Sequence, residues 1–285
     1  MNAPQGLTIG QLASLACTLE VCAPKPGNVH RSADFEDVTL QDFLASAIAI
    51  GPVFDQAPSL SLGQLILQSV AATSRMTRTN TNLGMLLLMA PLAMPQDAAN
   101  LQQDAAAAIE NSTAQDAADI YAAINLAKPG GMNTSAEHDI AGSAPPHILD
   151  AMKLAADRDS IARQYTTSLA DLFDQVVPLL TDTTHKHLPL SQRIVHTHVC
   201  LMAQMPDTLI ARKNGDETAL QSTMLAKRVI DAGPPMEDDY MQQLGNLDFW
   251  LRCNGHKRNP GTTADLIAAG LFVCLRQKTI VAPFV

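Results

Sequence analysis

Apolar residues recur at the spacing of one helical face along most of this chain. In the first such segment, Ile9, Leu12, Leu15 and Leu19 fall on one face, with Thr8 before them as a cap, and the run ends at Pro24. The same period predicts further helices over residues 39–51, 62–76, 147–177, 191–205, 207–215, 218–232 and from Thr262 or Thr263 onward. The 147–177 segment holds the pattern longest and is predicted to be a single helix.

Alternating strand patterns are absent except in the tail, residues 279–285, which we expect to be strand-like. No strand is followed by a phosphate-binding glycine loop, which excludes a Rossmann unit and a P-loop. The chain is therefore predicted to be all-α, with one compact multi-helix domain over residues 1–285 and a nucleotide cleft between helices.

Composition supports a globular protein with a large core. Of its 285 residues, 47% are hydrophobic and only 16% are charged. The most apolar stretch, residues 83–94, is shorter than the roughly 20 residues that span a bilayer, so we expect no membrane helix. The first ten residues show no secretory signal and the five cysteines form no Cys-x-x-Cys pair, which together favour a cytoplasmic protein.

The net charge of −9 argues against nucleic acid as a partner, because that binding needs a basic surface. Any phosphate site must therefore be locally basic, and short polar segments that interrupt the helices are the candidates. These segments are residues 24–28, 80–84, 129–131, 157–159, 207–215 and 259–265. In each, Gly or Pro, or a charged turn, stands beside Lys, Arg, Asn or Asp, and the combination suits a polyphosphate ligand.

Two cations precede the last of these segments, which leads into a helix start. Lys257, Arg258 and Asn259 precede Pro260-Gly261, so a phosphate could bind at the positive end of the following helix. A solvated loop capped by Thr262 explains the same residues equally well.

Two other segments combine carboxylates with arginines. Thr208 and Arg212 lie one turn apart, with Lys213 beside them, although an ordinary N-cap at Asp207 with basic residues at the helix end accounts for most of that pattern. Asp159 and Arg163 lie four residues apart and would ordinarily form an exposed ion pair. Apolar neighbours alternatively place the 157–159 cluster in a cleft, where charges need partners or ligands.

The remaining turns are individually unspecific. The segment around Lys25 and the 129–131 turn would let a backbone approach a ligand closely. Asn80 could hydrogen-bond a ribose or a phosphate, but capping the helix that follows is the more ordinary role.

Taken together and in order, these segments resemble the triphosphoribosyl-dephospho-CoA synthase family. The resemblance rests on Pro24-Lys25-Pro26-Gly27, the Asn80-Thr81 turn, Pro129-Gly130-Gly131, Asp207-Thr208 with Arg212 and Gly215, and Asn259-Pro260-Gly261 before Ala264-Asp265-Leu266. It implies an all-helical enzyme that transfers the triphosphoribosyl group of ATP to the 2′-hydroxyl of dephospho-CoA and releases adenine. Mg²⁺ is expected with the ATP.

The chain departs from the citrate-lyase type of this family. Asn82 stands where that type has a histidine, no Glu occurs between residues 62 and 76, and the segment after the Lys-Pro-Gly turn reads Arg31-Ser32-Ala33-Asp34. The 80–84 turn is more similar to a divergent branch found in archaea and some methylotrophic or planctomycete bacteria. The acid and base residues are therefore expected to differ from the citrate-lyase type.

The resemblance implies roles for particular residues. Asp159, Asp207 or Asp265 would act as base or metal ligand, and Asn80, Asn82 and Asn259 would orient sugar, phosphate or metal. The expected phosphate clamps are Lys25, Arg158, Arg163, Arg212, Lys213, Lys257 and Arg258.

Three questions stay open from sequence. The acceptor could be another hydroxyl compound and the donor a phosphoribosyl diphosphate, as in phosphoribosyl transfer for tetrahydromethanopterin-type cofactors. The chain could also be a non-catalytic nucleotide-binding protein, since a His and a Glu are missing. Homo-oligomer formation is undecided.

Overall fold

The computed structural model describes residues 6–129 and 144–284, most of which lie in helices. The segment before residue 130 contains α1 (Ile9–Cys22), α2 (Leu40–Phe54), the 3-10 turn η1 (Ala57–Ser59), α3 (Leu62–Ser74), α4 (Leu83–Ala93), α5 (Leu101–Glu110) and α6 (Ala114–Ala127). The segment after residue 143 contains α7 (Ile148–Ala155), α8 (Ser160–Thr166), the π-helical turn η2 (Leu172–Val176), α9 (Val177–Thr181), the 3-10 turn η3 (Thr183–His185), α10 (Leu190–Gln204), α11 (Thr208–Asn214), α12 (Asp216–Asp231), α13 (Asp238–Arg252), the short strand β1 (Cys253–His256) and α14 (Gly261–Arg276).

Several helices begin where the sequence offers a matched pair of capping residues. Thr8, Ser61 and Thr113 each accept a hydrogen bond from the third backbone N–H of α1, α3 and α6, and the side chain at that third position bonds back to the cap. Such reciprocal bonds satisfy backbone groups that a helix start leaves unpaired. These boundaries are therefore fixed by local sequence.

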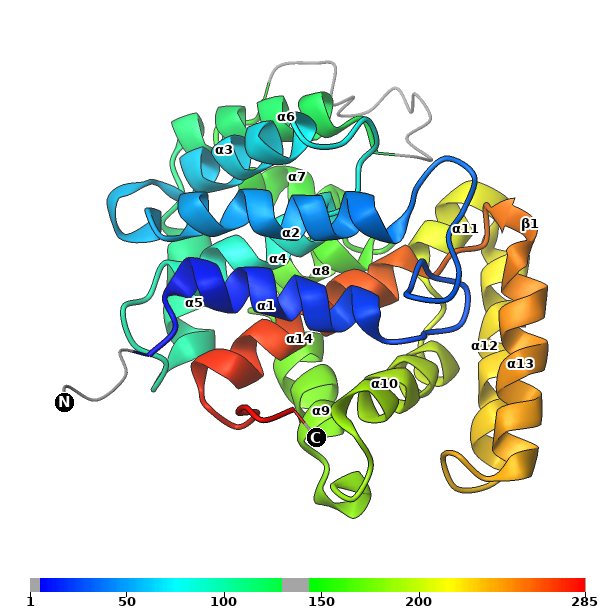
Figure 1. Ribbon diagram of the computed structural model, residues 1–285. Helices are drawn as coiled ribbons and strands as arrows, with labels where there is room; N and C mark the ends of the chain where they lie inside the picture. Colours follow the sequence, from blue (N-terminus) through cyan, green and yellow to red (C-terminus); the bar gives the residue numbers. More distant parts are fainter. Residues whose placement is uncertain (1–5, 130–143, 285) are drawn as a thin grey trace, which may run out of the picture.

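Helix α14 lies at the centre of the molecule and is almost wholly buried from Thr262 to Arg276. It packs against α1 and α4 on one side and against α9 and α10 on the other (Figure 1). Helices α12 and α13 pack together at one edge, connected to the centre through α10 and α11. This arrangement brings the start of α14 next to the starts of α4 and α11.

The prediction of a mainly helical chain is confirmed, but the longest predicted helix is wrong. Residues 147–177 form α7 and α8 with a break between them, followed by a turn in which Ser168 and Leu169 have positive φ angles of 52° and 61°. Asp159 causes the first break, because its side chain caps α8 by accepting hydrogen bonds from the N–H groups of Ile161 and Ala162. The apolar periodicity continued across a real helix end.

Two smaller predictions also differ from the structure. Residues 279–284 contain no strand, and the extended segment found in the described chain is β1 instead. Helix α2 continues through Pro52 to Phe54, beyond the predicted stop. Within the described residues, we find no helix with both the length and the apolar character required to cross a bilayer.

Candidate active site

Two adjoining cavities lie at the place where α4, α11 and α14 begin. The first encloses about 290 Å³ and is bordered by α4, α6, α7, α8 and α11. The second encloses about 690 Å³ and extends towards the loops before α2 and α4. Seven residues border both, namely Asn80, Leu83, Gly84, Leu209, Lys213, Asn259 and Asp265.

The N-terminus of α4 and the first turn of α14 form the wall between the cavities. Asn80 caps α4, because its Oδ1 accepts hydrogen bonds from the N–H groups of Asn82 and Leu83 at 3.3 and 3.0 Å. Asp265 lies directly against Gly84, where an added Cβ would come within 2.5 Å of the Asp265 Cγ. Gly84 is thus required for the carboxyl group of Asp265 to reach this wall.

The environment of Asp265 favours a protonated carboxyl group. Burial raises its pKa well above the usual range, and the negative charges of Glu20, Asp207 and Asp159 raise it further. A hydrogen bond from the backbone of Met85 acts in the opposite direction. An acid of this kind, placed at the border of two cavities, can give a proton to a bound molecule.

Three cations border the first cavity. They are Arg158, Arg212 and Lys213, and the cavity also has an apolar wall that includes Tyr121 and Ile161. Arg212 Nη1 donates to Asp159 Oδ2 at 2.7 Å, while its Nε is buried without a hydrogen-bond partner among the described residues. These donors and the apolar wall suit a ligand that carries both phosphates and a flat ring.

Lys213 and Asn259 border both cavities and contact each other there. Lys213 Nζ donates to Asn259 Oδ1 at 3.3 Å. Burial lowers the pKa of Lys213, and the neighbouring Arg212 lowers it further. A nearby anion would compensate for both effects.

The second cavity is more polar and contains Asn82. Asn82 Nδ2 donates to Thr73 Oγ1 at 3.1 Å, and the side chain is almost completely buried. Arg78 and Lys128 add positive charge to the border of this cavity, and Glu20 adds a carboxylate. Asn80 and Asn82 both border this cavity, and their contact with a ligand stays a prediction.

The prediction for Asp207 as base or metal ligand is contradicted by its hydrogen bonds. Its Oδ1 accepts from the N–H groups of Leu209 and Ile210, and its Oδ2 accepts from the N–H and hydroxyl of Thr263. The side chain is buried and borders neither cavity. Asp207 therefore joins the starts of α11 and α14, which positions Asp265 two residues beyond Thr263.

Lys25 is also not placed to bind phosphate. Its side chain has no exposed surface, and its Nζ pairs with Glu20 Oε1 at 2.9 Å and donates to the carbonyl of Ala23. Burial raises the pKa of Glu20 even though Lys25 opposes that shift. The Lys-Pro-Gly turn thus carries an internal ion pair, and only its Glu20 partner borders the second cavity.

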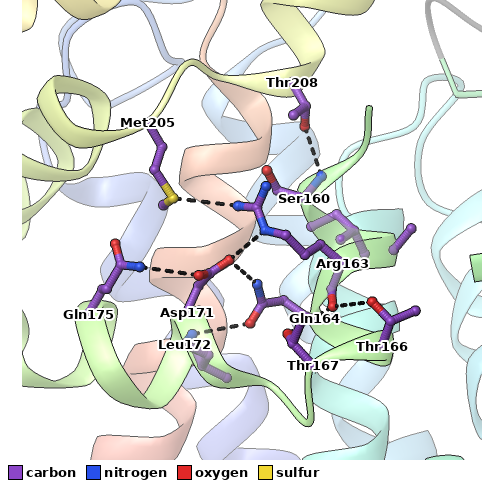
Figure 2. Close-up of polar contacts among 12 residues, drawn as sticks. Ser160, Arg163, Gln164, Thr166, Thr167, Asp171, Leu172, Gln175, Met205 and Thr208 are labelled. Atoms are coloured by element: carbon purple, nitrogen blue, oxygen red, sulfur yellow. Dashed lines mark hydrogen bonds and ion pairs between the residues drawn. The ribbon is translucent and has the colours of Figure 1, made fainter. Parts of the chain in front are cut away.

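Arg163 borders neither cavity, contrary to the prediction that it clamps a phosphate. Its Nε pairs with Asp171 at 2.9 Å, and its Nη2 contacts the sulfur of Met205 (Figure 2). The expected pair between Asp159 and Arg163 does not form, because Asp159 pairs with Arg212 instead. Helix spacing alone gave the wrong partner, since Asp159 is a cap outside the regular helix.

Lys257 and Arg258 likewise border neither cavity. Arg258 stacks on Trp250, with its guanidinium carbon 4.3 Å from the ring centre, and donates to the Trp250 carbonyl. Lys257 is exposed to solvent. Of the predicted 129–131 turn, Pro129 borders the first cavity, and Gly130 and Gly131 lie outside the described residues.

Comparison with known proteins identifies the family. Residues 7–283 match the family described as ATP:dephospho-CoA triphosphoribosyl transferase. The chain belongs to this family. It is therefore a transferase, and the family activity is the transfer of a triphosphoribosyl group from ATP to dephospho-CoA.

A solved structure supports the same fold. A protein from Archaeoglobus fulgidus, described as a triphosphoribosyl-dephospho-CoA synthase, superposes with a TM-score of 0.63 at 24% sequence identity. The match covers 82% of this chain and 98% of that one. None of the curated proteins compared matches this chain.

Sequence reasoning missed several residues that border the site. Glu20, Asp37, Arg78 and His256 all border the second cavity. Asp37 stands in the loop before α2 and His256 at the end of β1, 219 positions apart, so no local pattern links them. Glu20 fell on the predicted apolar helix before Lys25, and an isolated carboxylate on such a helix was its only signal.

Proposed function

We propose that ATP binds in the first cavity and dephospho-CoA in the second, and that triphosphoribosyl transfer occurs beside Asp265. The observation that carries this proposal is the shared wall, because a two-substrate transfer requires both substrates to reach one point. The two cavities meet at Asp265, Lys213 and Asn259. Binding two reactants at fixed positions contributes much of the rate of such reactions.

The first cavity has the features that ATP requires. Its apolar wall around Tyr121, Ile124 and Ile161 suits the adenine ring, and Arg158, Arg212 and Lys213 suit the triphosphate. The second cavity is larger, as the longer dephospho-CoA molecule requires. The ribose C1′ of ATP would then lie at the shared wall, with the adenine base in the first cavity.

The reaction requires two proton movements. The acceptor 2′-hydroxyl oxygen forms a bond to C1′ of the ATP ribose while the bond from C1′ to adenine N9 breaks. Because the transition state resembles an oxocarbenium ion, the leaving adenine must gain a proton and the hydroxyl must lose one. Asp265, whose pKa is raised by burial and by neighbouring carboxylates, is suited to protonate the adenine.

Mg²⁺ is expected to enter with ATP, where it would neutralise phosphate charge. Mg²⁺ commonly binds through one or two carboxylates together with substrate phosphates. The described residues contain no group of three His, Cys, Asp or Glu side chains placed to hold a metal ion. The carboxylates of Glu20, Asp37 and Asp159 already have ion-pair partners. This arrangement fits a metal ion whose ligands come mainly from the triphosphate.

Both nucleotide substrates are cytoplasmic compounds, so we expect the enzyme to act in the cytoplasm. Adenine release distinguishes this function from phosphoribosyl transfer with a diphosphate donor, which would release diphosphate instead. The same readout excludes a binding protein without catalysis.

The test measures free adenine and the mass of the product with ATP, Mg²⁺ and dephospho-CoA. We expect one adenine per triphosphoribosylated acceptor in the wild type, and a loss of about 10²- to 10⁴-fold in rate for Asp265→Asn, which cannot transfer the proton. Asp231→Asn is the matched control, because Asp231 is exposed, pairs with Lys227 and borders neither cavity. Adenine release by Asp265→Asn at the wild-type rate would remove Asp265 from the mechanism.

A further inference from the structure

The second cavity contains a histidine and an aspartate that form a hydrogen-bonded pair. His256 Nδ1 and Asp37 Oδ1 are 2.8 Å apart, and both residues border the cavity that Asp265 also borders. His256 comes from the end of β1, and Asp37 from the loop before α2. The pair thus joins two distant segments across one side of the proposed acceptor cavity.

Packing holds the imidazole ring of His256 in place. The ring contacts Phe35 edge to face, with centroids 5.9 Å apart and planes at 80°. Arg252 lies over the same Phe35 ring at 5.2 Å. Two independent contacts, one to a carboxylate and one to an aromatic ring, therefore orient His256.

The pairing decides which nitrogen of His256 can accept a proton. When Nδ1–H donates to Asp37, the lone pair of the neutral ring is on Nε2. No hydrogen-bond partner of Nε2 is found within residues 6–129 and 144–284. Asp37 also stabilises the imidazolium that forms when Nε2 takes up a proton, as carboxylates do in other histidine pairs.

We propose that His256, oriented by Asp37, is the general base that removes the proton from the acceptor hydroxyl. This inference rests on the proposed function, in which the acceptor occupies the second cavity. As the C1′–O bond forms, the hydroxyl proton passes to Nε2, and the proton of Asp265 passes to the departing adenine. Proton exchange with solvent then restores both groups, so the net proton moves from hydroxyl to adenine.

The two proton-transfer groups have different surroundings, as an acid and a base require. Asp265 is enclosed beside other carboxylates, whereas the His256 side chain is 42% exposed. Charged groups near the His256–Asp37 pair include Arg252, which lies over Phe35, and Lys213, whose pKa is influenced by Asp37.

The experiment compares His256→Ala, His256→Gln and wild type in adenine release, with kcat and KM for dephospho-CoA determined separately. We expect kcat to fall about 10²- to 10⁴-fold in both variants with KM nearly unchanged. Glutamine can keep a hydrogen bond to Asp37 but cannot take up a proton, so it should not restore the rate. Added imidazole should partly restore His256→Ala, in proportion to the neutral imidazole present.

Two further variants complete the test. Asp37→Asn should lower kcat by less, and its effect should not add to that of His256→Ala, because both act on one step. His187→Ala is the matched control, since His187 is exposed and borders neither cavity.

The outcomes separate this inference from the proposed function. Wild-type protein that releases no adenine would overturn the proposed function itself. If the wild type is active, three results would overturn only the role of His256 as base. They are full activity in His256→Ala, recovered activity in His256→Gln, and no rescue of His256→Ala by imidazole although the acceptor binds normally.

Discussion

A single methyl group added at Gly84 should disable Asp265 while leaving the fold intact. In Gly84→Ala the new Cβ would lie 2.5 Å from Asp265 Cγ and 3.2 Å from its Cβ. Ordinary carbon contacts are about 3.5–4.0 Å, so the carboxyl group must move by about 1 Å. The side chain can move because it faces the cavities rather than a packed core.

A displacement of about 1 Å at a catalytic group can reduce turnover about 10²-fold. We therefore expect Gly84→Ala to release adenine about 100 times more slowly than wild type, measured by chromatography under saturating ATP and acceptor. Stability should change little, because alanine favours a helix by up to about 1 kcal/mol over glycine and offsets part of the local strain. Urea denaturation measures that balance.

Gly245→Ala is the matched control. Gly245 lies within α13, and an added Cβ there would have no atom within 4 Å. This variant should gain up to about 1 kcal/mol in unfolding free energy and keep full activity. Unchanged adenine release in Gly84→Ala would refute the argument that the position of Asp265 against Gly84 governs the reaction.

Three other changes test the structure by urea denaturation. Asp207→Asn should lower the free energy of unfolding by about 2–4 kcal/mol, because an amide nitrogen cannot accept the buried hydrogen bonds now accepted by one carboxylate oxygen. A loss under about 1 kcal/mol would contradict the structural role of Asp207. Lys25→Met should lower the free energy of unfolding by about 3–5 kcal/mol, because it leaves Glu20 without its buried partner. Adding Glu20→Gln to this variant should recover part of that loss. Equal stability of the single and double variants would argue against the ion pair. Burial, and to a smaller extent the charge of Arg252, lowers the pKa of His30 to about 4. The unfolded chain therefore binds a proton more readily than the folded one, so stability should fall as pH decreases from about 6.5 to 4. His30→Gln should reduce that fall, and an identical pH dependence in both proteins would exclude His30 as its source.

Periodicity and capping residues were sufficient to predict most helices, because both act within a few residues. Thr8 and Ser61 cap the helices whose starts were predicted near them. Periodicity failed between α7 and α8, where Asp159 ends the regular run by capping the next helix although the apolar pattern continues. A cap in the middle of a periodic run cannot be distinguished from an exposed helical carboxylate by spacing alone.

The site was predictable in composition but not in pairing. Asn80, Arg158, Arg212, Asn259 and Asp265 do border the cavities, as the polar segments indicated. Which cation meets which carboxylate depends on how the helices pack.

The same limit applies to the buried cations and to the second cavity. Lys25 and Arg163 are used internally, because each meets a carboxylate within its own region of the chain. Asp37 and His256 meet only when the loop before α2 and the end of β1 come together in the folded chain, which no local pattern could indicate.

The most direct test is a crystal structure with dephospho-CoA and an ATP analogue that cannot lose its base. We predict the analogue's adenine against Tyr121 and its phosphates near Arg212, with dephospho-CoA in the second cavity. The ribose C1′ and the acceptor hydroxyl should meet beside Asp265. Nucleotides bound on another face, or both substrates in one cavity with Asp265 out of reach, would contradict the account.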